Sequence, residues 1–197
     1  MDIKFNNAYS SDHYTGTFIP KVDKNPFYVL LQADREQNLD VMTAFHEYQH
    51  LVDYIEFTKA ISVKSAFELK DNPLYATFNI YSEFSATKTG VVQYVNCVQI
   101  EGLTKEETCS ELLEWSKESY LNQDGIQNRY QYLYHVMQYL GYIFAAAESI
   151  PDFDATPYLC VIDLLQELQS LLKHMGSFET TYEWYECFDT LAREFVG

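Results

Sequence analysis

The sequence has few cysteines, few basic residues and no long hydrophobic run. Its four cysteines, Cys97, Cys109, Cys160 and Cys187, include no CxxC pair. A thiolate zinc finger or a disulfide framework is therefore not indicated, and we expect reduced, buried thiols. Only 13 Lys and Arg residues accompany 29 Asp and Glu residues, which gives a formal net charge of −16. Because nucleic-acid affinity depends on clustered basic side chains, no nucleic-acid partner is expected.

Neither a membrane segment nor a targeting segment is indicated. The longest strongly apolar run, residues 142–147, is too short to span a bilayer, and the start MDIKFNNAYSSDHY lacks the features of a signal peptide. We therefore expect a cytoplasmic protein with no membrane partner. With 197 residues, of which 47% are hydrophobic and 16% aromatic, the chain can bury a sizeable core. Nothing in these features indicates an oligomeric state.

The N-terminal forty residues differ in pattern from the rest. Two β-rich runs, HYTGTFIPKV and PFYVLLQ, flank a turn-like DKN and predict a β-hairpin. From Asn38 onward helical periodicity dominates, and capping signals at Asn72–Pro73, Thr104, Thr156–Pro157 and Ser177 mark helix starts. The predicted helices cover about 39–60, 73–98, 104–120, 126–149, 156–176 and 178–195. We therefore expect an α+β fold that is predominantly α-helical.

One helical turn carries a metal-site motif, because residues 46–50 read HEYQH. His46 and His50 lie about one turn apart on one helix face, so both imidazoles can reach one ion. A Zn²⁺ ion held by two imidazoles and a carboxylate keeps its fourth position for water, whose pKa it lowers toward about 7. Glu47 is placed to take that proton and pass it to a leaving amine. The spacing therefore predicts a zinc site with Glu47 as general base; the alternative is an ordinary helix that carries HExxH by coincidence.

A third ligand must come from another part of the chain. Glu56 would lie about 15 Å along the helix axis from His46 and on another face, so it cannot reach without a break in the helix. Glu68 is possible but lies near the end of its segment. Glu83 is favoured because it lies midway along a long helix that can return antiparallel to the first. Three small residues around it allow the close approach of two helices: Ser82, Ser85 and Ala86. The alternative is that Glu83 faces solvent.

The order of these features resembles the gluzincin metallopeptidases, especially the ImmA/IrrE-like group of phages and other mobile elements. The resemblance covers about residues 13–95 and depends on the hairpin, HEYQH and Glu83 followed by Ala86. It implies a zincin-like core over 1–98, in which the hairpin packs on the HExxH helix pair. It also implies His46, His50 and Glu83 as Zn²⁺ ligands with Glu47 as general base. The resemblance does not extend to residues 99–197, which we expect to form a C-terminal helical bundle packed on this core or continuous with it.

The sequence departs from the family pattern in three respects. It has no helix-turn-helix signature of the kind that often accompanies these peptidases. Thermolysin-like members carry an aspartate four residues after the third ligand, and here that position is Thr87, a weaker acceptor; Asp53, one turn after His50, is a second candidate for orienting a ligand. No oxyanion donor is evident among 17 tyrosines, and His135 is one candidate for that role.

The sequence thus predicts a zinc metallopeptidase that cleaves an intracellular protein or peptide substrate. A second hypothesis is a catalytically silent zincin fold that acts as a protein-binding or regulatory module. The presence of Glu47 favours the peptidase. The scarcity of residues that could orient the metal ligands favours the silent zincin. A third hypothesis is a helical interaction protein with a coincidental HExxH. The substrate and the cleaved bond are not indicated.

Overall fold

The computed structural model describes residues 2–5, 16–19, 28–31, 37–63, 69, 71–97, 102–122, 126 and 128–197, with side chains from Val41 onward. Three short strands, β1 (Asp2–Phe5), β2 (Gly16–Ile19) and β3 (Tyr28–Leu31), form one sheet in the order β1-β3-β2. β2 pairs antiparallel with β3, as the predicted hairpin requires, and the predicted DKN turn lies outside the described residues. β1, which was not predicted, pairs parallel with β3.

From residue 37 onward the described part of the chain contains seven helices and no strand, which confirms the predominantly helical character. They are α1 (Gln37–Ala60), α3 (Tyr75–Cys97), α4 (Lys105–Tyr120), α5 (Arg129–Ser149), α6 (Thr156–Leu159), α7 (Leu165–Met175) and α8 (Tyr182–Val196). Thr104 and Glu107 form the predicted capping box of α4. In the described residues, no helix combines the length and apolar character needed to cross a membrane.

Three predicted helix boundaries are wrong. The helix expected over 156–176 is divided into α6 and α7, because Leu164 adopts a left-handed conformation with φ of 59° that a right-handed helix cannot contain. α8 is capped by Thr181, whose side chain accepts from the backbone N–H of Trp184, and Ser177 instead donates to a backbone carbonyl. α3 begins at Tyr75, after a turn at Asn72.

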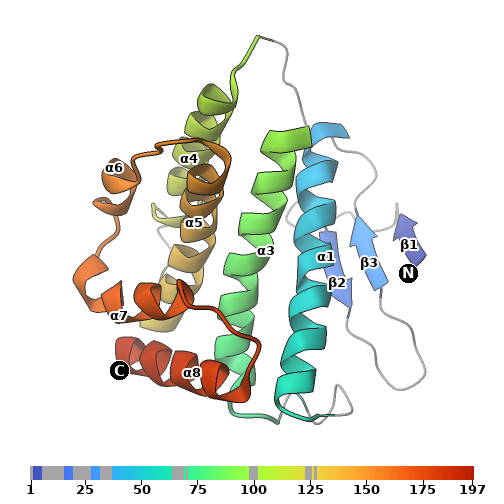
Figure 1. Ribbon diagram of the computed structural model, residues 1–197, viewed down its shortest axis with the longest axis vertical. Helices are drawn as coiled ribbons and strands as arrows, with labels where there is room; N and C mark the ends of the chain where they lie inside the picture. Colours follow the sequence, from blue (N-terminus) through green and yellow to red (C-terminus); the bar gives the residue numbers. More distant parts are fainter. Residues whose placement is uncertain are drawn as a thin grey trace.

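α3 is the central helix, packed between α1 and α5 (Figure 1). It runs antiparallel to α1 and in the same direction as α5. β2 and β3 contact α1, α4 packs on α5, and α8 crosses the N-terminal end of α3 (Figure 1). Because α3 has neighbours on several sides, most of its residues are buried, including polar ones such as Ser82 and Thr87. Buried polar groups need hydrogen-bond partners, so this helix is where polar networks are expected.

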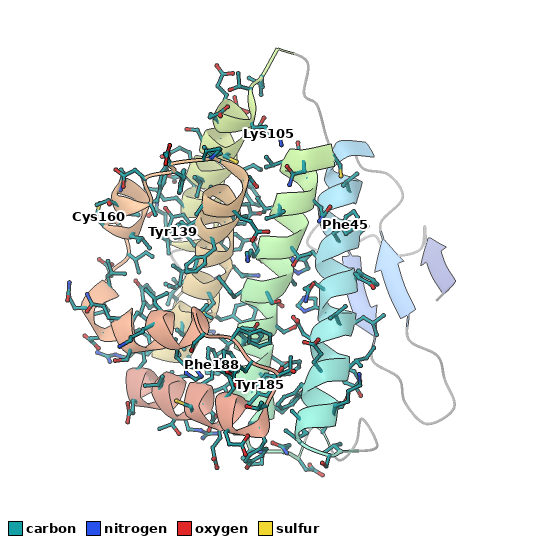
Figure 2. The ribbon with its side chains drawn as sticks, viewed as in Figure 1. Phe45, Lys105, Tyr139, Cys160, Tyr185 and Phe188 are labelled. Atoms are coloured by element: carbon teal, nitrogen blue, oxygen red, sulfur yellow. The ribbon has the colours of Figure 1, made fainter. Side chains whose placement is uncertain are left out.

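The core is rich in aromatic contacts where α1, α3 and α8 meet. The ring of Phe57 stacks on that of Phe78 at 4.1 Å between centroids, and Tyr185 meets Phe57 edge-on at 4.9 Å. Figure 2 shows Tyr185 and Phe188 of α8 pointing toward the lower end of α3, and both are fully buried. Aromatic pairs of this kind add roughly 0.5–1.5 kcal/mol each beyond the burial of apolar area. The expected burial of the thiols is wrong for three cysteines, since only Cys109 is buried.

Candidate metal site

Three ligand-type side chains converge where α1 contacts α3. His46 and His50 of α1 and Glu83 of α3 each offer one ligand atom, and these atoms lie within 4.8 Å of one another. The Nε2 atoms of the two histidines are 3.1 Å apart. Nε2 of His46 lies 3.8 Å from Glu83 Oε2, and Nε2 of His50 lies 3.8 Å from Glu83 Oε1. The two nitrogens and the carboxylate therefore surround one point in space.

A glycine on α3 brings the two helices this close. A Cβ atom placed on Gly90 would lie 2.7 Å from the backbone oxygen of Met42 and 3.3 Å from Cβ of His46. The missing side chain lets the α3 backbone approach α1 beside His46. Two turns earlier on α3, Glu83 is then close enough to face both histidines. The sequence prediction attributed this approach to Ser82, Ser85 and Ala86, and it did not include Gly90, where the two helices also come close.

The spacing of these atoms fits a tetrahedral metal ion. With metal–ligand bonds of about 2.0–2.1 Å, two ligand atoms on one tetrahedral zinc are about 3.4 Å apart. The nitrogen–nitrogen distance of 3.1 Å lies just below that value, and each nitrogen lies 3.8 Å, just above it, from a different oxygen of Glu83. The side chains of His46, His50 and Glu83 are 23%, 16% and 19% exposed, so an ion can reach them from the surface. Two imidazoles and a carboxylate suit zinc and also accept other divalent ions.

The electrostatics of the site keep both imidazoles neutral, which is the state that binds a metal. Burial, and next the neighbouring His50, lower the pKa of His46 to about 4 against the opposing effect of Glu83. Burial also lowers the pKa of His50 to about 4. Near neutral pH both rings therefore carry a lone pair without having to lose a proton to the solvent.

Behind His50 lies a buried hydrogen-bond network centred on Asp53. Ser82 Oγ lies 2.8 Å from His50 Nδ1 and donates to Asp53 Oδ2 at 3.1 Å. The other oxygen, Asp53 Oδ1, accepts from Gln49 Nε2 at 2.7 Å and from Ser85 Oγ at 3.2 Å. Burial raises the pKa of Asp53 to about 7. Asp53, predicted as a residue that orients a ligand, is thus linked to His50 by hydrogen bonds through the hydroxyl of Ser82.

On its opposite side, Glu83 is held by α5. Gln138 Nε2 donates to Glu83 Oε2 at 3.0 Å. The hydroxyl of Tyr134 also hydrogen-bonds Glu83, and burial raises the pKa of this phenol above its ordinary range, so it stays a donor. Two side chains from the helical half of the chain therefore fix the carboxylate that faces the histidines.

The remaining predicted residues lie in different surroundings. Glu47 follows His46 on α1 and its side chain is buried. Thr87 packs at the contact between α3 and α5, since a Cβ atom on Gly141 would lie 2.8 Å from Thr87 Cβ. The ring of His135 lies 6.3 Å from that of Tyr120, and its Nδ1 is buried without a hydrogen-bond partner in the described part of the chain. His135 is not in the group that converges on the metal position.

Three residues of the site were not singled out for these roles by sequence reasoning. Ser82 was interpreted only as a small residue, although its position directly before Glu83 could have suggested a polar role. Tyr134 is one of 17 tyrosines, so no single one stood out. Gln138 carries no motif at all, because its contact depends on how α5 packs against α3.

No protein-family model matches the chain, and neither the curated proteins nor the solved structures contain a match. The structure therefore establishes a helical protein in which His46, His50 and Glu83 form a group that can bind a metal ion.

Proposed function

We propose that this protein is a zinc-dependent peptidase that hydrolyses peptide bonds of an intracellular protein. The observation that carries the proposal is the convergence of His46, His50 and Glu83 within 4.8 Å, with Glu47 directly after the first histidine. The resemblance of HEYQH and Glu83 to the gluzincin pattern of the ImmA/IrrE-like peptidases supports it. The antiparallel arrangement of α1 and α3 supports it as well, because it brings the third ligand to the histidine pair.

In this proposal each side chain has a distinct role. When bound, a zinc ion supplies a Lewis acid for a water molecule and for the peptide carbonyl. Glu47 removes a proton from the water and delivers it to the leaving amine. His135 is not in the group at the metal position, and the one proton of the Tyr134 hydroxyl serves Glu83, so either residue would have to move to donate to the developing oxyanion. The substrate is a protein or peptide; neither nucleic acid nor membrane is part of the proposal.

Metal content tests the first half of the proposal. Elemental mass spectrometry on untagged protein should find about one zinc per chain in the wild type, because the site offers three protein ligands. The variants His50→Ala and Glu83→Gln should lose it. Glu148→Gln is the matched control, since Glu148 lies on the surface of α5 paired with Lys88 and should leave the zinc content unchanged. Zinc that survives in Glu83→Gln would contradict the ligand set.

Cleavage of a peptide library, monitored by mass spectrometry, tests the second half. Glu47→Gln should keep its zinc and lose at least about 100-fold in cleavage rate, because general-base catalysis is worth roughly 10²–10⁴-fold. The peptidase proposal fails if the zinc-loaded wild type cleaves no peptide or added protein, or if the Glu47→Gln variant cleaves the same ones. The catalytically silent zincin that binds a protein partner then becomes the better hypothesis.

A further inference from the structure

A single buried hydroxyl lies between a metal-site histidine and a buried carboxylate. We propose that Ser82 is a positioning residue that fixes the tautomer of His50 and so holds the Nε2 lone pair of that ring toward the metal position. The inference rests on the metal site of the proposed function and is independent of the peptidase chemistry.

The direction of the hydrogen bonds follows from counting protons. A serine hydroxyl has one proton, and Ser82 gives it to Asp53 Oδ2 at 3.1 Å. At 2.8 Å from His50 Nδ1, the Ser82 oxygen can therefore only accept, and His50 must donate from Nδ1. A neutral imidazole has one N–H, so Nε2 of His50 carries the lone pair.

Asp53 is kept in the accepting role by its other partners. Gln49 and Ser85 both donate to Oδ1, which leaves Oδ2 for Ser82. Gln49 is itself oriented, because Thr89 Oγ1 donates to Gln49 Oε1 at 3.2 Å and so turns the amide nitrogen toward Asp53. Asp53 is 2% exposed and Ser82 is 4% exposed, so water does not compete for these bonds.

The lone pair fixed in this way points at the candidate ligands. Nε2 of His50 lies 3.1 Å from Nε2 of His46 and 3.8 Å from Oε1 of Glu83. Ser82 and Glu83 are consecutive on α3, so one turn of this helix supplies one ligand and orients another on α1. Asp53 therefore acts on His50 through the hydroxyl of Ser82.

The tautomer is measured directly by NMR of the histidine ring nitrogens in ¹⁵N-labelled, metal-free protein, with His50 assigned from a His50→Gln variant. The measurement is made at pH 8, because burial raises the pKa of Asp53 to about 7 and the carboxylate must be an acceptor. We expect His50 to be protonated at Nδ1 in the wild type and to gain an Nε2–H population in Ser82→Ala. The matched control Ser85→Ala removes a donor to the same carboxylate and should leave the tautomer unchanged. A wild type protonated at Nε2, or a Ser82→Ala variant that keeps Nδ1–H, would overturn the inference.

Zinc affinity, measured by competition with a chromophoric chelator, gives the functional consequence. Ser82→Ala should weaken zinc binding by roughly 10- to 100-fold, the usual effect of removing a group that orients a ligand, while Ser85→Ala changes it by less than about threefold. Equal affinities of wild type and Ser82→Ala would overturn the positioning role. If the wild type binds no zinc, the proposed function fails, and the tautomer measurement still decides the assignment of Ser82.

Discussion

At the scale of single residues, two partly buried neutral imidazoles make the metal-free protein sensitive to acid. Burial lowers the pKa values of His46 and His50 from 6.5 to about 4. Between pH 6.5 and about pH 4 the unfolded chain binds more protons than the folded one, so the free energy of unfolding falls as the pH falls. Each histidine contributes at most about 3 kcal/mol to this loss, from 1.36 kcal/mol per pKa unit. The same neutral imidazoles that suit a metal therefore lower the free energy of unfolding in acid.

The variant His46→Gln isolates this effect. Its free energy of unfolding relative to the wild type should rise as the pH falls from 6.5 toward 4, because the variant no longer holds an imidazole that resists protonation. Urea denaturation of both chelator-treated proteins over this range measures the difference. Asp53, whose pKa is raised, has the opposite pH dependence, but it is present in both proteins and cancels. Parallel curves for the two proteins would contradict the predicted burial of a neutral His46.

The residues of the site differ in how well the sequence alone indicates them. His46 and His50 could be predicted because a spacing of four places side chains on one helix face whatever surrounds the helix. Glu83 could be favoured from the expected return of the next helix. Ser82 and Gln138 act through contacts between helices, and those contacts depend on how far each helix is rotated about its axis, which no local pattern specifies.

At the scale of helices, the contact of α1 with α3 depends on Gly90. Gly90→Ala should destabilise the protein by about 1–3 kcal/mol, the usual cost of overpacking, because the new Cβ would lie 2.7 Å from the backbone oxygen of Met42. A backbone atom cannot move aside as a side chain can, so the helices must separate. The same shift moves His46 away from Glu83, and zinc affinity should fall as well. Urea denaturation and chelator competition measure the two effects.

Two other glycines serve as controls for this prediction. Gly141→Ala is equally crowded, at 2.8 Å from Thr87, but lies at the contact of α3 with α5, so it should lower stability with a smaller loss of zinc affinity. Gly176→Ala meets only ordinary contacts, the nearest at 3.4 Å, and should change neither quantity appreciably. If Gly90→Ala and Gly141→Ala reduce zinc affinity equally, the loss reflects general destabilisation and not helix separation at the site.

At this scale, a capping box made one helix start predictable. Thr104 and Glu107 form the predicted capping box of α4. Asn128, whose side chain caps α5 by accepting from the backbone N–H of Gln131, was not identified in the sequence, which placed the start of that helix at about residue 126. The break between α6 and α7 has no such signal, because the left-handed residue there is Leu164 instead of a glycine or asparagine. Packing of the surrounding helices, rather than local preference, must hold that residue in place.

At the scale of the whole molecule, the C-terminal helix is tied to the start of the central one. Asp189 accepts from Thr77 Oγ1 and from Arg193 Nε, both at 2.7 Å, and Arg193 also donates to the backbone oxygen of Pro73. Glu83, on the same central helix, is held by Gln138 and Tyr134 of α5. These bonds cross the predicted division between residues 1–98 and 99–197. We propose that both halves form one continuous domain, the second of the two predicted arrangements.

Zinc binding tests this continuity, because a ligand stabilises only the unit that unfolds with its site. With Trp115 replaced by Phe, fluorescence reports on Trp184 alone, which is buried in α8. Zinc at a free concentration about 100 times its dissociation constant should add roughly 2.7 kcal/mol to the free energy of unfolding. In one cooperative unit this shift appears equally in Trp184 fluorescence and in circular dichroism, and it disappears in Glu83→Gln. If zinc leaves the unfolding transition seen by Trp184 fluorescence unchanged but shifts part of the transition seen by circular dichroism, the chain consists of two domains. The contacts of α5 and α8 with α3 would then be too weak to couple the helical half to the site that α5 helps to form.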